Sequence, residues 1–244
     1  MDKLSVCIAT YNGEKYLRQQ IESIQSQLSG HDEIIISDDS STDRTIEIIE
    51  DINDSRIRLF KNCSFRSPIY NFEYCLTKAT GDIIFISDQD DLWLPNKVAT
   101  VCAVFQDNQR ITLVASDAQI IDANGEIVVN TFYSDHIKFT SKVIPIIIKN
   151  RFLGCTLAFR RSILEVLLPF PSHLPMHDSW IGIMNQLYGR VHFINTPLIS
   201  YRRHSQNFSS STHSSLFQMI KWRLRLTIAV IGKIWKYKGR KCVI

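Results

Sequence analysis

The sequence lacks the patterns that mark several common classes of protein. Its six cysteines form no Cys-x-x-Cys pair and have no metal-ligand spacing with the histidines, which argues against a zinc site and favours free thiols in a reducing compartment. No apolar run reaches about twenty residues, so we expect no membrane-spanning helix. The first residues do not form a signal peptide, and we therefore expect a cytoplasmic protein.

A glycine-rich phosphate loop is also missing. The turn that follows the first predicted strand, residues 10–13, reads Thr-Tyr-Asn-Gly and does not match G-x-G-x-x-G. This argues against a dinucleotide-binding oxidoreductase. It also weakens the case for a nucleotidyltransferase, which nevertheless stays open as an alternative.

Acidic residues are absent from the C-terminal segment. Residues 216–244 contain eight Lys or Arg and no Asp or Glu, although the whole chain has a net charge of only +4, so residues 1–215 are net acidic. Tryptophans and aliphatic residues are interspersed with these cations. The segment is too charged to cross a bilayer and is typical of an amphipathic helix on an anionic membrane surface. A helix that packs on the domain or on a second subunit is the alternative. We expect no nucleic-acid partner.

Strand-like and helix-like patterns alternate through the first half of the chain. Residues 4–9, 33–37 and 83–86 are apolar runs typical of buried strands, and segments with apolar residues at helical spacing separate them. This order predicts an α/β fold with a mostly parallel central sheet flanked by helices. Each of the three strands ends in polar residues, at the edge of the sheet where α/β proteins bind ligands.

The strand at residues 83–86 is followed by a dense acidic run. Asp88, Asp90 and Asp91 lie within four positions. Clustered negative charges cost free energy unless a cation shares the site. A hard divalent metal that is held by a few carboxylates keeps coordination positions open for phosphate oxygens. The run therefore predicts a metal site, with a solvated turn as the alternative.

Six motifs resemble glycosyltransferase family two, the inverting enzymes with the GT-A fold. In chain order they occupy residues 5–12, 37–45, 87–95, 154–156, 177–180 and 201–207. The Asp-Gln-Asp-Asp-x-Trp form, followed by His-Asp-x-Trp and Tyr-x-x-His, is most similar to bacterial rhamnosyltransferases of surface-polysaccharide assembly.

The resemblance implies a division of the chain. A GT-A domain would cover residues 1–207, with a nucleotide-sugar-binding half at about 1–110 and an acceptor-binding half at about 111–207. A Ser-rich linker at 208–215 and the basic amphipathic tail at 216–244 would follow.

The resemblance also implies roles for single residues. Tyr11 would stack on the nucleobase, Asp39 would accept hydrogen bonds from the base or ribose, and Asn71 would lie near the donor. The full set implied for donor binding is Ala9, Thr10, Tyr11, Asp39, Asn71, Asp88 and Asp90.

Mn²⁺ or Mg²⁺ is the implied cofactor. It would be held by Asp88, Asp90, Asp91 and His204, with Asp90 nearest, although His204 could instead be structural. Asp178 would be the catalytic base. It lies at the start of a predicted helix, where the helix dipole favours the ionised carboxylate, and a plain helix cap is the alternative.

The activity implied is transfer of a sugar from a nucleotide-diphosphate donor to a hydroxyl of a polyprenyl-diphosphate-linked glycan. Rhamnose from dTDP-rhamnose is the first hypothesis for the donor. The setting would be bacterial O-antigen or capsule biosynthesis, with the protein peripheral on the inner face of the cell membrane. A catalytically weak binding subunit that recruits a partner to the membrane is the non-enzymatic alternative.

Overall fold

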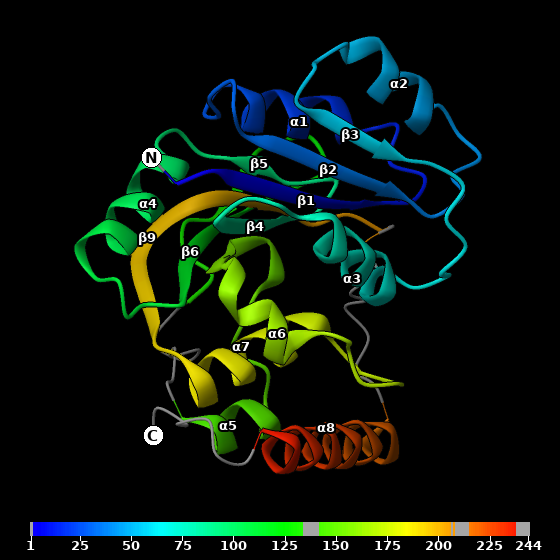
Figure 1. Ribbon diagram of the computed structural model, residues 1–244. Coiled ribbons are helices and arrows are strands. Elements are labelled where there is room, and N and C mark those ends of the chain that lie inside the picture. Colours follow the sequence, from blue (N-terminus) through cyan, green and yellow to red (C-terminus); the bar gives the residue numbers. More distant parts are fainter. Residues whose placement is uncertain (1, 134–141, 206, 208–214, 238–244) are drawn as a thin grey trace.

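The structure is a computed structural model that describes residues 2–133, 142–205, 207 and 215–237. A nine-stranded sheet runs through the molecule, with the order β3-β2-β1-β4-β8-β6-β9-β5 and with β7 paired to β6 (Figure 1). The strands are β1 (Leu4–Thr10), β2 (Glu33–Asp38), β3 (Ile57–Phe60), β4 (Ile83–Ser87), β5 (Leu92–Trp93), β6 (Leu113–Ile121), β7 (Ile127–Val129), β8 (Leu157–Arg160) and β9 (Val191–Arg202).

Helices cover both faces of this sheet. One face packs against α1 (Leu17–Gln25), α2 (Thr45–Ile52) and α4 (Lys97–Asp107). The other packs against α3 (Pro68–Lys78), α5 (Val143–Ile148), α6 (Leu164–Leu167), α7 (His177–Tyr188) and α8 (Leu216–Lys236). The α/β class and the flanking helices are thus confirmed.

The two halves of the sheet differ in strand direction. β1, β2, β3 and β4 are all parallel, as the alternating pattern predicts. Beyond β4 the sheet is mixed, because β8 runs antiparallel to both β4 and β6, whereas β9 is parallel to β6. A buried apolar run shows that a strand is present but does not reveal its direction, which depends on the connections.

The C-terminal helix packs on the domain. Leu226 and Val230 are buried, Lys233 Nζ donates to the carbonyl of Leu168 at 3.0 Å, and the Tyr237 hydroxyl donates to the carbonyl of Glu165 at 2.7 Å. α8 therefore adopts the packed arrangement given above as the alternative, while its opposite side stays exposed. Within the described residues, no helix has the length and apolar character needed to cross a membrane. Most of the predicted linker (208–214) and the end of the tail (238–244) lie outside those residues.

Candidate active site

A cavity of about 690 Å³ opens at the carboxyl ends of β1, β2 and β4. Segments from both halves of the chain line it, including the start of α3, the turn after β4 and the start of α7. Among the lining residues are all those predicted to bind the donor, together with the predicted base: Ala9, Thr10, Tyr11, Asp39, Asn71, Asp88, Asp90 and Asp178. The structure thus brings these eight residues together. Asp91 and His204 lie beside the cavity rather than in its lining.

Asp39 closes the β2 side of the cavity. One carboxylate oxygen accepts from the amide of Phe65 at 2.6 Å and the other from the amide of Ser67 at 3.1 Å. Asp39 therefore holds the loop that leads into α3. Each oxygen keeps a second lone pair with which it could accept a hydrogen bond from a ligand.

Tyr11 stands exposed at the mouth of the cavity, and Gln89 fixes its backbone. The Tyr11 amide donates to Gln89 Oε1 at 2.9 Å, and Gln89 Nε2 donates back to the Tyr11 carbonyl at 3.0 Å. A Cβ at Gly13 would lie 2.7 Å from Gln89 Oε1, so glycine leaves room for this pairing. The sequence analysis assigned no role to Gln89 and missed this one.

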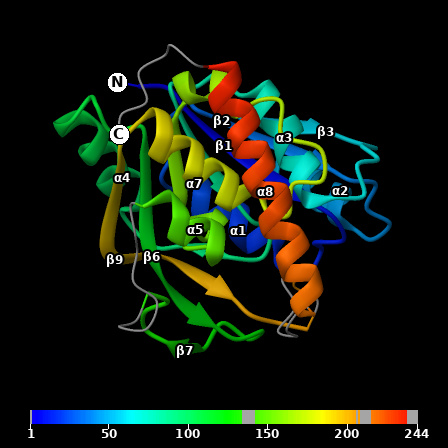
Figure 2. The same ribbon diagram turned by 90° about the horizontal axis from the view of Figure 1, so that it is seen from below.

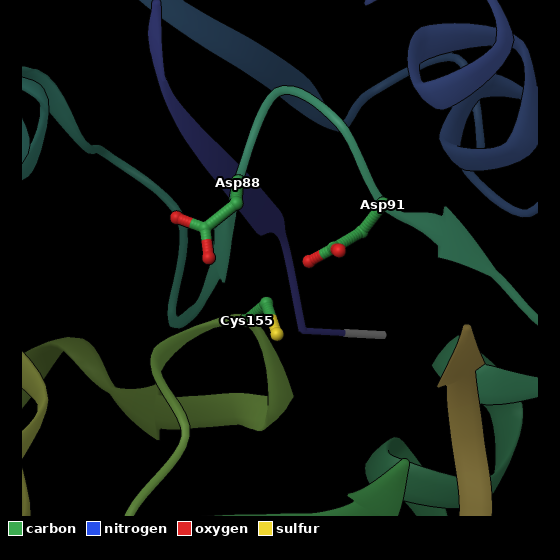
Figure 3. A group of neighbouring side chains, drawn as sticks. All are labelled: Asp88, Asp91 and Cys155. Carbon is green, nitrogen blue, oxygen red and sulfur yellow. The ribbon is translucent and has the colours of Figure 1, made fainter. Parts of the chain in front are cut away.

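Asp88 and Asp91 flank the turn after β4, with Cys155 across the gap between them (Figure 3). Ligand atoms of these three residues all lie within 4.8 Å of one another. Asp91 Oδ1 accepts from the amide of Arg202 at 2.8 Å, and its Oδ2 has no partner in the described part of the chain. This oxygen is therefore left for another partner. The buried Lys97 lies beside the cluster, since its Nζ donates to the carbonyl of Cys155 at 3.1 Å.

Burial is the main reason why this cluster resists ionisation. It raises the pKa of Asp88 to about 7, with smaller contributions from Asp90 and Asp178, and raises the pKa of Asp91 well above its ordinary value. The pKa of the Cys155 thiol is also raised by burial, so the thiol stays neutral and is a poor ligand for a hard cation. The two carboxylates supply the oxygen ligands that Mn²⁺ or Mg²⁺ prefers, and a divalent ion would offset their charge beyond what Lys97 supplies. Cys155 was missed as a member of this group because its spacing matches no metal motif.

Asp90 belongs to a second group. Its Oδ2 lies 2.8 Å from His204 Nε2 and accepts from Asn207 Nδ2 at 2.9 Å. Arg202 supports the same turn, since its Nε donates to the Asp90 carbonyl at 2.8 Å. The residues predicted to hold the metal are therefore divided between two groups, with Asp88 and Asp90 the two that face the cavity.

Asp178 lies in the first turn of α7, on the opposite side of the cavity from β1 and β2. Its Oδ1 accepts from the Ser179 amide at 2.6 Å, and its Oδ2 accepts from Asn150 Nδ2 at 2.8 Å. Burial raises the pKa of Asp178 to about 6, although these hydrogen bonds oppose the rise. A carboxylate with this pKa is ionised at neutral pH and is a stronger base than an exposed aspartate. Asn150 lies outside all six motifs, and no sequence signal identified it.

His177 is a buried neutral imidazole beside this carboxylate. Its ring packs on Phe72 with the centroids 4.5 Å apart, and burial lowers its pKa to about 4. Neither ring nitrogen has a hydrogen-bond partner among the described residues. A Cβ at Gly154 would lie 2.9 Å from His177 Nε2, so the glycine accommodates the imidazole.

The chain matches the sequence model of a known family over a range that includes most of the residues lining this cavity. The sequence model of glycosyl transferase family 2 matches residues 5–168. An uncharacterized glycosyltransferase of Nostoc is 27% identical over 87% of this chain and 68% of its own length. The Escherichia coli UDP-Glc:alpha-D-GlcNAc-diphosphoundecaprenol beta-1,3-glucosyltransferase WfgD is 26% identical over 87% of this chain and 82% of its own length. A second such E. coli glucosyltransferase, WfaP, is 39% identical, but over only 41% of this chain and 39% of its own.

Solved structures support the fold. Residues 1–349 of Staphylococcus aureus TarS in complex with UDP-GlcNAc superpose with a TM-score of 0.71 at 18% identity, over 96% of this chain and 73% of that fragment. A Pyrobaculum calidifontis mannosyltransferase with GDP-Man and Mn²⁺ superposes with a TM-score of 0.59 at 18% identity, over 99% of this chain and 66% of that one. At these identities the likeness concerns the GT-A fold alone. Because the family model spans well over half of the sequence and includes the strand-end motifs that line the cavity, the chain belongs to glycosyl transferase family 2.

Proposed function

We propose that this glycosyltransferase moves a sugar, with inversion, from a nucleoside-diphosphate donor to a hydroxyl of a polyprenyl-diphosphate-linked glycan in bacterial polysaccharide biosynthesis. One observation carries the proposal. A single cavity joins the carboxylates of Asp88 and Asp90, at the end of β4, to a separate buried carboxylate, Asp178, whose pKa is about 6.

The division of the cavity supports the assignment of the two substrates. The ends of β1, β2 and β4 would bind the nucleotide, with Tyr11 against the base and Asp39 and Asn71 near the ribose. The segment around Gly154 and the start of α7 would bind the acceptor.

Asp178 would act as the base. It would take the proton of the acceptor hydroxyl while that oxygen attacks the anomeric carbon. A single displacement inverts the anomeric configuration and needs only one carboxylate on the acceptor side, whereas a double displacement would need another as the nucleophile. Asn150 and Ser179 hold Asp178 in place for this step.

Asp88 and Asp90 are proposed to hold Mn²⁺ or Mg²⁺, with Asp91 and His204 next to them. The ion would stabilise the negative charge of the departing nucleoside diphosphate. The Mn²⁺ in the Pyrobaculum neighbour makes Mn²⁺ the first ion to test.

The donor sugar has two candidates. The motif resemblance favours rhamnose from dTDP-rhamnose, whereas the names of the two E. coli relatives specify UDP-Glc and a diphosphoundecaprenol acceptor. We propose UDP-glucose as the first donor to test and dTDP-rhamnose as the second. The 216–244 tail is proposed to associate with the inner face of the cell membrane, where such an acceptor resides.

The test is a turnover assay of the full chain with UDP-glucose, dTDP-rhamnose, UDP-GlcNAc and GDP-mannose, each with Mn²⁺ or Mg²⁺. A polyprenyl-diphosphate-linked monosaccharide serves as acceptor. We expect one donor to release nucleoside diphosphate only when acceptor is present, together with an elongated lipid-linked product. Asp178→Asn should lower this turnover about 10³-fold. Asp32→Asn replaces a buried aspartate that bonds the Leu4 amide at the far edge of the sheet, and it is the matched control.

Two other outcomes would contradict the proposal. Consumption of a nucleoside triphosphate with release of pyrophosphate would identify a nucleotidyltransferase. Donor binding without turnover on any acceptor would favour the binding-subunit alternative.

A further inference from the structure

Two helices of the second half leave rows of large apolar side chains exposed. On α8 the row follows a spacing of three and four residues, which aligns it along one side of the helix. Its members are Phe217, Ile220, Leu224, Ile228, Ile231 and Trp235, each more than half exposed. On α5, Ile144 and Ile148 are 71% and 56% exposed, four residues apart.

These rows belong to neighbouring helices. α5 and α8 contact one another, and both lie on the side of the molecule that Figure 2 views, away from the sheet. The buried residues Leu226, Val230 and Lys233 hold the opposite side of α8 against the domain. The row on α8 therefore stays directed outward while the helix is firmly docked.

The charges on these two helices are all positive. At the helical angle of about 100° per residue, Lys221, Arg225 and Lys236 follow one flank of the α8 row, and Lys149 ends α5. Two acids of other segments, Glu165 and Glu73, lie beside the packed side of α8, where they neighbour Tyr237 and Lys233. An occupant that offers apolar contact and negative charge together would therefore suit the exposed rows.

An anionic bilayer offers both. Apolar side chains reach the acyl boundary, while Lys and Arg contact lipid headgroups. A second copy of this chain fits poorly, because two α8 rows packed together would bring cations near cations without an acid on either helix.

The geometry points to one lipid-docking surface made by α5 and α8 together, and we propose that α5 binds an anionic bilayer jointly with the C-terminal helix. α5 ends two residues before Asn150, whose side chain bonds Asp178, and α7 contacts both docking helices. The acceptor side of the cavity is thus joined directly to the lipid-facing elements. The choice of a membrane rests on the lipid-linked acceptor proposed above.

The test is vesicle flotation of the full chain without donor or acceptor. Vesicles of phosphatidylglycerol with phosphatidylethanolamine are compared with vesicles of phosphatidylcholine. The variants are Ile144→Glu/Ile148→Glu on α5 and Ile228→Glu/Trp235→Glu on α8. Val128→Glu is the matched control, because Val128 is 64% exposed on β7 and belongs to neither docking helix. Circular dichroism and donor-induced thermal shift check that each variant is folded.

We expect the wild type and Val128→Glu to float with the anionic vesicles. Each docking variant should bind these vesicles at least about tenfold more weakly than the wild type does. Wild-type flotation by the folded α5 variant would overturn the role of α5. Failure of the wild type to float would overturn the surface as a whole. A concentration-dependent dimer that both docking variants abolish, without vesicle binding, would show that a second copy covers it. Vesicle binding by a protein that transfers no sugar would contradict the proposed function but not this surface.

Discussion

Carboxylates at the two edges of the parallel strands are treated in opposite ways. At the amino edge, Glu33 accepts hydrogen bonds from Ser5, Thr80 and Arg58. Although burial alone would raise its pKa, these partners lower it to about 2. At the carboxyl edge, the half-buried Asp88 and the buried Asp178 have fewer partners, and their pKa values rise to about 7 and about 6.

The difference separates an acid whose charge is compensated within the fold from acids whose charge is not. A lowered pKa means that the folded state favours the ionised form, so Glu33 adds to stability at neutral pH. A raised pKa means that ionisation is unfavourable in the folded state, so Asp88 and Asp178 reduce stability at neutral pH. Residues that lower stability in this way are expected where a substrate or cation supplies the missing contacts.

The largest effect is expected from Asp178→Asn. If Asp178 is the base, kcat should fall about 10³-fold, while the affinity for the donor stays near that of the wild type. Steady-state kinetics and calorimetric titration of the donor measure the two quantities, and unchanged kcat would remove Asp178 as the base.

Asp88→Asn is expected to have the next largest effect. Loss of one carboxylate should weaken donor binding about 100-fold in the presence of Mn²⁺, and should reduce the response of the enzyme to chelator. Calorimetric titration of the donor with and without Mn²⁺ measures both. Two results together would contradict the metal assignment: the variant binds the donor as tightly as the wild type does, and chelator leaves the activity of the wild type unchanged.

The position of the acids at the carboxyl edge was predictable from the sequence, because parallel strands end at one edge. The run of apolar residues before Asp39 and Asp88 placed both acids at that edge, and both line the cavity with Asp178. The contacts of Asn150 and Cys155 were not predictable. They depend on irregular segments that fold back onto residues 28 or more positions away, which no local pattern records.

The strand directions in the second half of the sheet were likewise not predictable from local sequence patterns. β8 carries an ordinary apolar pattern, yet it runs antiparallel between β4 and β6, which only the complete chain path determines. The composition of α8 suited both a membrane and a protein surface. The structure shows that one side of α8 packs on the domain, and the sequence pattern alone could not identify that side.

Glu33→Gln tests whether the paired carboxylate at the amino edge of the sheet stabilises the fold. It should lower the free energy of unfolding by about 2 kcal/mol at pH 7 and leave kcat unchanged, because the charge that Arg58 pairs with is lost far from the cavity. The difference from wild type should be complete above about pH 4.5 and narrow as the pH falls toward 2, the range between the ordinary and lowered pKa values of Glu33. Urea unfolding across this pH range provides the measurement. If the two proteins were equally stable at pH 7, Glu33 would not stabilise the fold, and the contrast drawn between the two edges would be wrong.

The smallest effect is expected from Asn150→Ala, which tests whether Asn150 sets the pKa of Asp178. Asn150 Nδ2 bonds the ionised form of Asp178 at 2.8 Å and thereby lowers its pKa, so removing this donor should raise the pKa above about 6. The acidic limb of the profile of kcat/KM against pH should then move up by about one unit. The variant should be about fivefold slower than wild type near pH 6, about tenfold slower near pH 5, and close to it at pH 9. A merely structural role for Asn150 would instead lower the rate equally at every pH, and an unshifted profile would show that the Asn150 contact does not set the basicity of Asp178.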